Sequence, residues 1–217
     1  MQTRTKKLMV LAILSALAYI VMVVGRIPVV MFLKYDPADV IITIGGFLYG
    51  PMAAFAMSTV VSFVEMFTVS DTGLIGLVMN IIQTCSFAGT AAFIYKSKRT
   101  ITRAIIGLIV GWLLTTAVML LWNYFITPIY MGIPREAVAK LLIPAFLPFN
   151  LLKGGLNAAI TMLLYKPIKR GLYKSHLMSV SEETSASTGK INIGTMLVSS
   201  FIIITCVLLI LVFQGHI

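Results

Sequence analysis

Three polar side chains share one face of an apolar segment in the last third of the chain. Asn150, Lys153 and Asn157 lie in the apolar run 146–165, at positions i, i+3 and i+7. Residues at this spacing project from the same side of an α-helix. A lysine at mid-bilayer costs roughly 3 kcal/mol, so its three donors need acceptors. We expect this face to line a pocket; the alternative for Lys153 is that its ammonium snorkels to the outer membrane interface.

Two further amides lie in other apolar runs. Asn123 is near the end of the run 104–126, and Asn80 lies within the run 73–95. For Asn80 the alternative is a hydrogen bond between helices, which contributes about 1 kcal/mol. An amide presents a donor and an acceptor side by side, as the edge of a pyrimidine-like ring does. A pocket with several amides and one cation would fit a neutral, planar, hydrogen-bonding ligand.

The composition places these residues in a membrane protein. Of the 217 residues, 59% are hydrophobic and 11% are charged, and the mean hydropathy is +1.00. A soluble domain of this size needs a larger polar surface. The net charge of +10 does not indicate a nucleic-acid partner, because the basic residues cluster just outside the apolar runs, where they set orientation in a lipid bilayer.

The apolar pattern predicts an all-α fold with six membrane helices. The apolar stretch 37–69 is too long for one straight span, and Gly50-Pro51 offers a break. With this break, the three basic clusters at the N-terminus, at 96–103 and at 166–174 lie on one side, which is then cytoplasmic. The amides and Lys153 fall in the extracellular half. The predicted helices are 8–24, 37–48, 51–69, 73–95, 104–126 and 146–165.

Two acidic features are harder to interpret. Asp36 can cap a helix whose first residue is Pro37, and Asp39 can reach back to the same turn. Capping alone is the interpretation that we favour for this pair. Glu65, near the outer end of the run 51–69, could pair with Lys153 or face water, and the sequence does not decide between these.

The C-terminal part of the chain departs from this pattern. Residues 175–192 are rich in Ser, Thr and Glu and predict a polar cytoplasmic linker. The run 193–213 is long enough to be an additional transmembrane helix. We therefore divide the chain into a six-helix substrate-binding domain (1–174), a linker (175–192) and a further membrane helix (193–217). The sequence contains no phosphate-binding loop and no catalytic motif that we recognise, so we expect neither ATP hydrolysis by this chain nor an enzyme.

Several ordered motifs resemble the riboflavin-binding S components of energy-coupling factor (ECF) transporters. The likeness covers about residues 8–170. The motifs that carry it are FLKYDPAD at 32–39, GFLYGP at 46–51, NYFITP at 123–128, PREA at 134–137 and LPFNLLKG at 147–154.

The resemblance implies a six-helix subunit of the cytoplasmic membrane that captures riboflavin from outside. Riboflavin would be the transported substrate, and no cofactor is expected. The subunit would dock with a membrane scaffold protein and two cytoplasmic ATPases. Asn123, Asn150 and Lys153 match positions that hold the flavin. The first loop would act as a lid over it, and Ala12 and Ala16 match a docking motif on the first helix; the proposed lid residues are Phe32, Lys34, Tyr35 and Asp36.

Two alternatives remain open at this point. The same fold could bind another vitamin, such as thiamine or biotin, which a competition experiment would distinguish. A small membrane enzyme or assembly factor is a different class, and it would need a catalytic constellation. The run 193–213 adds a helix to the usual six, and its role is open.

Overall fold

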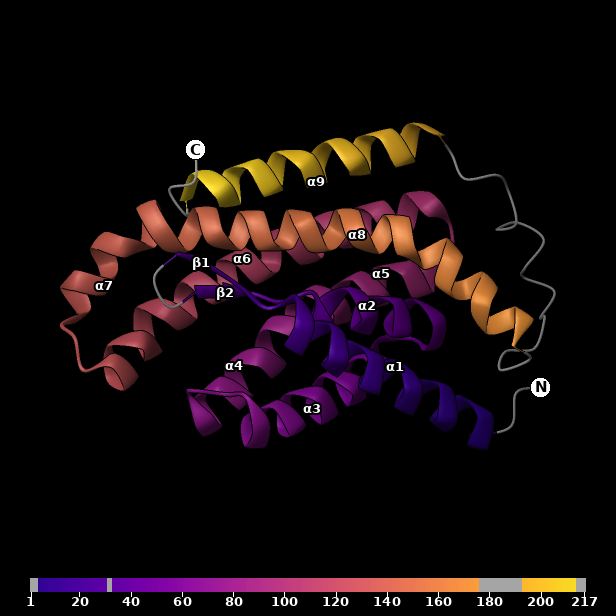
Figure 1. The fold of residues 1–217 in the computed structure, drawn as a ribbon, viewed down its shortest axis with the longest axis horizontal. Helices are drawn as coiled ribbons and strands as arrows, with labels where there is room; N and C mark the ends of the chain where they lie inside the picture. The colour runs from indigo at the N-terminus through magenta and orange to yellow at the C-terminus, as the bar shows by residue number, and fades with distance from the viewer. Residues whose placement is uncertain (1–3, 31–32, 176–192, 214–217) are drawn as a thin grey trace.

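The protein is an elongated bundle of helices with one short β-hairpin (Figure 1). The structure is a computed structural model, and it describes residues 4–30, 33–175 and 193–213. Most of the predicted linker and the predicted lid residue Phe32 lie outside this part of the chain. The elements are α1 (Arg4–Gly25), β1 (Ile27–Val30), β2 (Leu33–Tyr35), α2 (Ala38–Tyr49), α3 (Pro51–Thr68), α4 (Gly73–Thr84), η1 (Cys85–Gly89), α5 (Thr90–Ser97), α6 (Ile101–Met131), α7 (Arg135–Leu141), η2 (Leu142–Phe146), α8 (Leu147–Lys174) and α9 (Ile193–Phe213).

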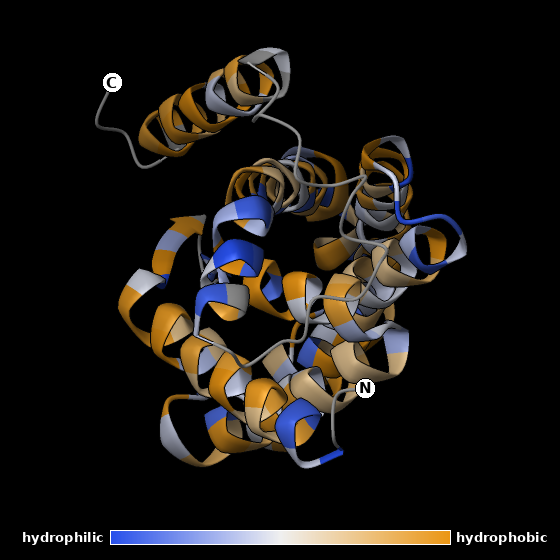
Figure 2. Ribbon diagram, turned by 90° about the vertical axis from the view of Figure 1, so that its right-hand side faces the viewer, coloured by the Kyte–Doolittle hydropathy of each residue, from blue (hydrophilic) through white to orange (hydrophobic). Residues whose placement is uncertain are grey.

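The expected all-α membrane architecture is confirmed. Within the described residues, five helical segments are long and apolar enough to cross a membrane, and α2 and α9 contribute shorter apolar helices. The start of α1 and the end of α8 lie at the same end of the bundle (Figure 1). Figure 2 views this end and shows hydrophilic turns there. This arrangement agrees with the charge argument, and the assignment of this end to the cytoplasm stays a prediction.

The predicted break before Pro51 is present and makes α2 the centre of the bundle. Gly50 has a φ of 94°, which favours glycine, and Pro51 is the first residue of α3. α2 is buried along its length from Ala38 to Leu48. A Cβ on Gly46 would lie 2.9 Å from the Cβ of Ala92 in α5 and 3.1 Å from that of Ala54 in α3, so α2 packs closely between these helices.

The segment between α1 and α2 contains a β-hairpin that the sequence did not predict. β1 and β2 are antiparallel and pair Ile27 with Tyr35 and Pro28 with Lys34. The predicted capping box is wrong: the N-cap of α2 is Pro37, which has no side-chain cap, and the helix begins at the next residue. Asp36 and Asp39 are engaged elsewhere, as described below.

Two helices extend beyond their predicted ends. α6 continues through Pro128 to Met131 and ends at Gly132, which adopts a left-handed conformation with a φ of 65°. α8 continues through Pro167 to Lys174. In both cases the predicted end of the helix lay near a proline or a lysine, but each helix continues past these residues.

The contact between α6 and the segment η1–α5 depends on two glycines four residues apart. A Cβ on Gly107 would lie 2.8 Å from the carbonyl oxygen of Ala91, and one on Gly111 would lie 2.6 Å from that of Phe87. Small residues at this spacing allow membrane helices to approach closely. This pair was not predicted from the sequence.

We predict that Gly111→Ala destabilises the bundle, because the added methyl group cannot fit against a backbone oxygen. Overpacking of this kind costs about 1–3 kcal/mol. Thermal unfolding of the purified protein in detergent measures the effect. Gly171→Ala in α8 is the matched control, since a Cβ there meets nothing within 4 Å. Equal unfolding midpoints for the two variants would contradict the close packing of α6.

Candidate functional site

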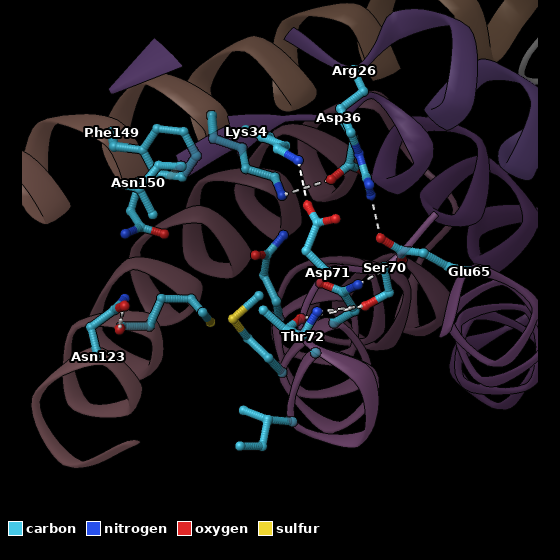
Figure 3. A pocket seen from close by; sticks show the side chains of 18 of the residues that line it. Arg26, Lys34, Asp36, Glu65, Ser70, Asp71, Thr72, Asn123, Phe149 and Asn150 are labelled. Carbon is cyan, nitrogen blue, oxygen red and sulfur yellow. Dashed lines mark hydrogen bonds and ion pairs between the residues drawn. The ribbon is translucent and has the colours of Figure 1, made fainter. Parts of the chain in front are cut away.

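A polar pocket lies at the end of the bundle opposite the basic clusters, between the hairpin and four helical segments (Figure 3). Four of the five predicted substrate-binding residues line it, and they come from three helices: Asn80 from α4, Asn123 from α6, and Asn150 and Lys153 from α8. The hairpin and the residue after it contribute Leu33, Lys34 and Asp36. The structure therefore brings together the amides that the sequence placed in one half of the membrane.

Lys153 is buried, and its ammonium does not snorkel. The residue is only 6% exposed, and its Nζ donates to Oδ2 of Asp36 at 3.3 Å. The carboxylate of Asp36 thus acts as the acceptor that a lysine at this depth requires. Because Asp36 directly follows β2, this ion pair also ties the hairpin to α8.

Two further ion pairs connect the hairpin region to the other side of the pocket. Arg26, which precedes β1, pairs with Glu65 of α3. Lys34 of β2 donates to Asp71 in the α3–α4 connection at 2.7 Å. The hydrogen bond from Lys34 lowers the pKa of Asp71 below its ordinary value. This second pair is exposed to solvent and contributes little to stability.

Glu65 and Asn80 settle a question that the sequence left open. Nδ2 of Asn80 donates to Oε2 of Glu65 at 2.6 Å, so the alternative of a hydrogen bond between helices is realised, and Asn80 also lines the pocket. The partners of Glu65 are Arg26 and Asn80. Glu65 therefore does not pair directly with Lys153, and it is 6% exposed at the pocket wall.

The amides of Asn123 and Asn150 are oriented by their own helices. Nδ2 of Asn123 donates to the carbonyl oxygen of Met119 at 2.7 Å, and Nδ2 of Asn150 donates to that of Phe146 at 2.7 Å. Oδ1 of Asn123 accepts a hydrogen bond from Thr127 at 2.9 Å. Figure 3 shows the amide oxygen of Asn150 on the side of the pocket interior, where it can accept a hydrogen bond from a ligand.

A second polar layer lies beneath the pocket and is centred on Asp39. This residue is 3% exposed, and its carboxylate accepts three hydrogen bonds. The donors are Thr84 at 2.6 Å, Gln83 at 3.1 Å and Asn157 at 3.2 Å. Since Gln83 also lines the pocket, Asp39 fixes the orientation of a pocket amide from below.

Asn157 belongs to this second layer and does not line the pocket itself. It is 1% exposed, and its Oδ1 accepts a hydrogen bond from the hydroxyl of Tyr35 at 2.9 Å. Burial raises the pKa of the Tyr35 phenol well above its ordinary value. Of the described lid residues, Lys34 and Asp36 line the pocket, whereas Tyr35 points toward α8 and anchors the hairpin.

Arg26 and Asp71 at the pocket were not predicted from the sequence. Asp36 was predicted as a helix cap and, from the resemblance, as a lid residue, whereas Asp39 was predicted only as a cap. A signal existed for Asp39, because an ionisable residue inside an apolar helix is a functional candidate by default. No signal existed for Arg26 or Asp71. Both lie in connections, and their positions depend on the hairpin and on the packing of α3.

A separate apolar groove lies between α1 and α3. Ala12 and Ala16 line it, together with Tyr19 of α1 and Val60 and Val64 of α3. The two alanines create the groove because they are smaller than their neighbours. Small residues of this kind let another membrane helix approach closely.

Comparison with known proteins identifies the family to which this chain belongs. Residues 6–165 match the family model described as "ECF transporter, substrate-specific component". The chain is 29% identical over 173 residues to the riboflavin transporter RibU of Staphylococcus aureus (strain TCH60), covering 75% of this chain and 90% of the relative. It is 27% identical over 179 residues to the riboflavin transporter FmnP of Bacillus subtilis (strain 168), covering 76% and 93%.

A solved structure gives the same result for the fold. It is described as "Structure and mechanism of the S component of a bacterial ECF transporter", and it matches with a TM-score of 0.66 and 28% sequence identity. The match covers 78% of this chain and 99% of the other. Since the family match spans most of the chain and every element that lines the pocket, this chain belongs to the substrate-specific (S) components of ECF transporters, a family of transport proteins and not of enzymes.

Proposed function

We propose that the chain is the riboflavin-binding subunit of an ECF importer in the cell membrane and that the polar pocket holds the vitamin on the extracellular side. The observation that carries the proposal is the convergence of Asn80, Asn123, Asn150 and Lys153 on one pocket. Relatives named as riboflavin transporters support the choice of ligand. Phe149 also lines the pocket and offers an aromatic ring to a flat ligand.

The charges of the pocket favour a ligand without net charge. Three cationic side chains line it, and each is paired with a carboxylate that lines it too: Arg26 with Glu65, Lys34 with Asp71, and Lys153 with Asp36. A cation such as thiamine or a carboxylate such as biotin would enter a lining that offers no unbalanced opposite charge. Riboflavin is neutral and presents the donor and acceptor edge that amides recognise.

The groove between α1 and α3 is the surface that we assign to the partner subunits. Ala12 and Ala16 would receive a helix of the membrane scaffold protein, and two cytoplasmic ATPases would drive release of the vitamin inward. The proposal is supported by the groove's apolar lining and by the family to which the chain belongs.

We predict that the purified full-length protein quenches riboflavin fluorescence with a 1:1 end point. Burial of the flavin ring beside aromatic and amide groups is the physical cause. Titration in detergent or nanodiscs measures the affinity, and competition with thiamine and biotin tests the ligand class. Absence of quenching, or displacement of riboflavin by thiamine or biotin at equal concentration, would refute the proposal.

We predict that Asn150→Ala and Lys153→Ala each weaken riboflavin binding about tenfold or more, because each leaves a ligand group without its partner at a cost of about 1–3 kcal/mol. The same titration measures this effect. Lys140→Ala in α7 is the control, since Lys140 is exposed and does not line the pocket. If both pocket variants keep the affinity of the unsubstituted chain, the assigned site is wrong.

We predict that Ala12→Leu impairs riboflavin uptake by cells and co-purification with the partner subunits, while riboflavin affinity stays unchanged. The larger side chain fills the groove and prevents close approach of a helix. Ile13→Leu on the same helix is the control, because Ile13 is exposed and lies outside the groove. Normal co-purification of Ala12→Leu would contradict the assignment of the groove.

A further inference from the structure

The last helix packs on the binding domain although it lies outside the region that matches the family. α9 runs antiparallel to α8, and its C-terminal end lies near the end of α8 at which β1 is found (Figure 1). One side of α9 is buried against the rest of the protein, at Ser199, Cys206 and Ile210. The other side is exposed, with Ile204 at 59% and Leu208 at 49%.

The buried side of α9 shares a small apolar cluster with the hairpin. Cys206 and Ile210 of α9 form this cluster with Val29 of β1, Tyr35 of β2, and Phe149, Leu152 and Leu156 of α8. Sγ of Cys206 lies 4.0 Å from the carbonyl oxygen of Leu152. Leu33 packs against the same cluster and also lines the pocket, as Phe149 does. The cluster that α9 joins therefore includes one residue of the pocket wall, Phe149, and packs against a second, Leu33.

α9 packs against α8 and the hairpin through one side only, although lipid could cover either side of an apolar helix. α9 contains no charged residue, and lipid tails solvate isoleucine as well as protein does, so burial of apolar area does not itself drive association. In a membrane, close fit between helices is a favourable contribution to packing. Ser199 and Cys206 are small and seven residues apart, hence on one face, and small residues at a helix interface allow this fit.

We propose that α9 is a positioning element of the binding site: it holds the hairpin against α8 over the pocket and thereby slows the departure of the bound ligand. The inference rests on the proposed function for its kinetic consequence. Leu33, Lys34 and Asp36 line the pocket, so movement of this segment opens one wall of the pocket to the ligand. Arg26 and Lys34 hold the segment toward α3 and Asp71, and α9 adds an apolar contact at β1.

The first test needs no ligand. Hydrogen exchange of the full-length protein in nanodiscs is compared for Ile210→Ala and Ile204→Ala, which make the same chemical change on the buried and exposed sides of α9. We expect the amides of β1 and β2 to exchange at least about threefold faster in Ile210→Ala, because loss of the contact raises the population of the open hairpin. Equal exchange in the two variants overturns the inference.

The same measurement separates positioning from general stability. If Ile210→Ala acts on the hairpin, amides of the central helix α2 and of α5 keep the protection that they have in the unsubstituted chain. Faster exchange throughout the bundle would assign α9 a merely structural role and would overturn the inference as well.

The second test measures the rate of riboflavin release after mixing with excess competitor. We expect release about three- to tenfold faster from Ile210→Ala than from Ile204→Ala, with the effect mainly on dissociation. Val29→Ala should act through the same contact, so the double variant Val29→Ala/Ile210→Ala should release riboflavin about as fast as the faster single variant.

The outcomes of the second test distinguish the two proposals. If the unsubstituted chain binds riboflavin and Ile210→Ala releases it no faster, the role of α9 is refuted and the proposed function stands. If the unsubstituted chain does not bind riboflavin, the proposed function and the kinetic role of α9 both fall, and hydrogen exchange still decides whether α9 holds the hairpin.

Discussion

The ion pair between Lys153 and Asp36 is the interaction on which the site depends. An ammonium inside a membrane helix is stable only with an acceptor, and here the acceptor comes from the segment that follows the hairpin. Removing one partner of a buried pair leaves an uncompensated charge, which is far more costly than the pair itself. The lysine therefore fixes both its own position in the pocket and the position of the hairpin end above it.

Asp39 extends this constraint downward into the bundle. Its carboxylate accepts hydrogen bonds from Gln83 and Thr84 of α4 and from Asn157 of α8. Asp39 itself lies at the start of the central helix α2. Asn157 in turn accepts a hydrogen bond from the Tyr35 hydroxyl. A fully satisfied buried network of this kind rigidifies what it connects. The floor of the pocket and its cover are thus held by linked groups, so a change at one is transmitted to the other.

The sequence predicted those features that follow from local pattern. The break at Gly50, the bounds of α9 and the common pocket of Asn123, Asn150 and Lys153 all follow from apolar length, charge placement and helical spacing. The hairpin escaped prediction because its pairing depends on the helices that flank it. The capping role of Asp36 was wrong for a related reason. A cap is a local interaction, whereas Asp36 instead pairs with Lys153, which is 117 residues away. Long-range pairing of this kind leaves no trace in spacing.

The arrangement of the bundle separates the contacts that cover the ligand from those that would receive a partner. α9 lies along α8 on one side, and the groove of α1 and α3 lies on the other (Figure 1). An added helix on the groove side would compete with any incoming helix for the small-residue surface. On the α8 side it contacts the hairpin instead and leaves the groove open. The position of α9 is therefore compatible with the proposed docking at the groove, and under the role proposed for α9 ligand retention could vary without a change in the surface between α1 and α3.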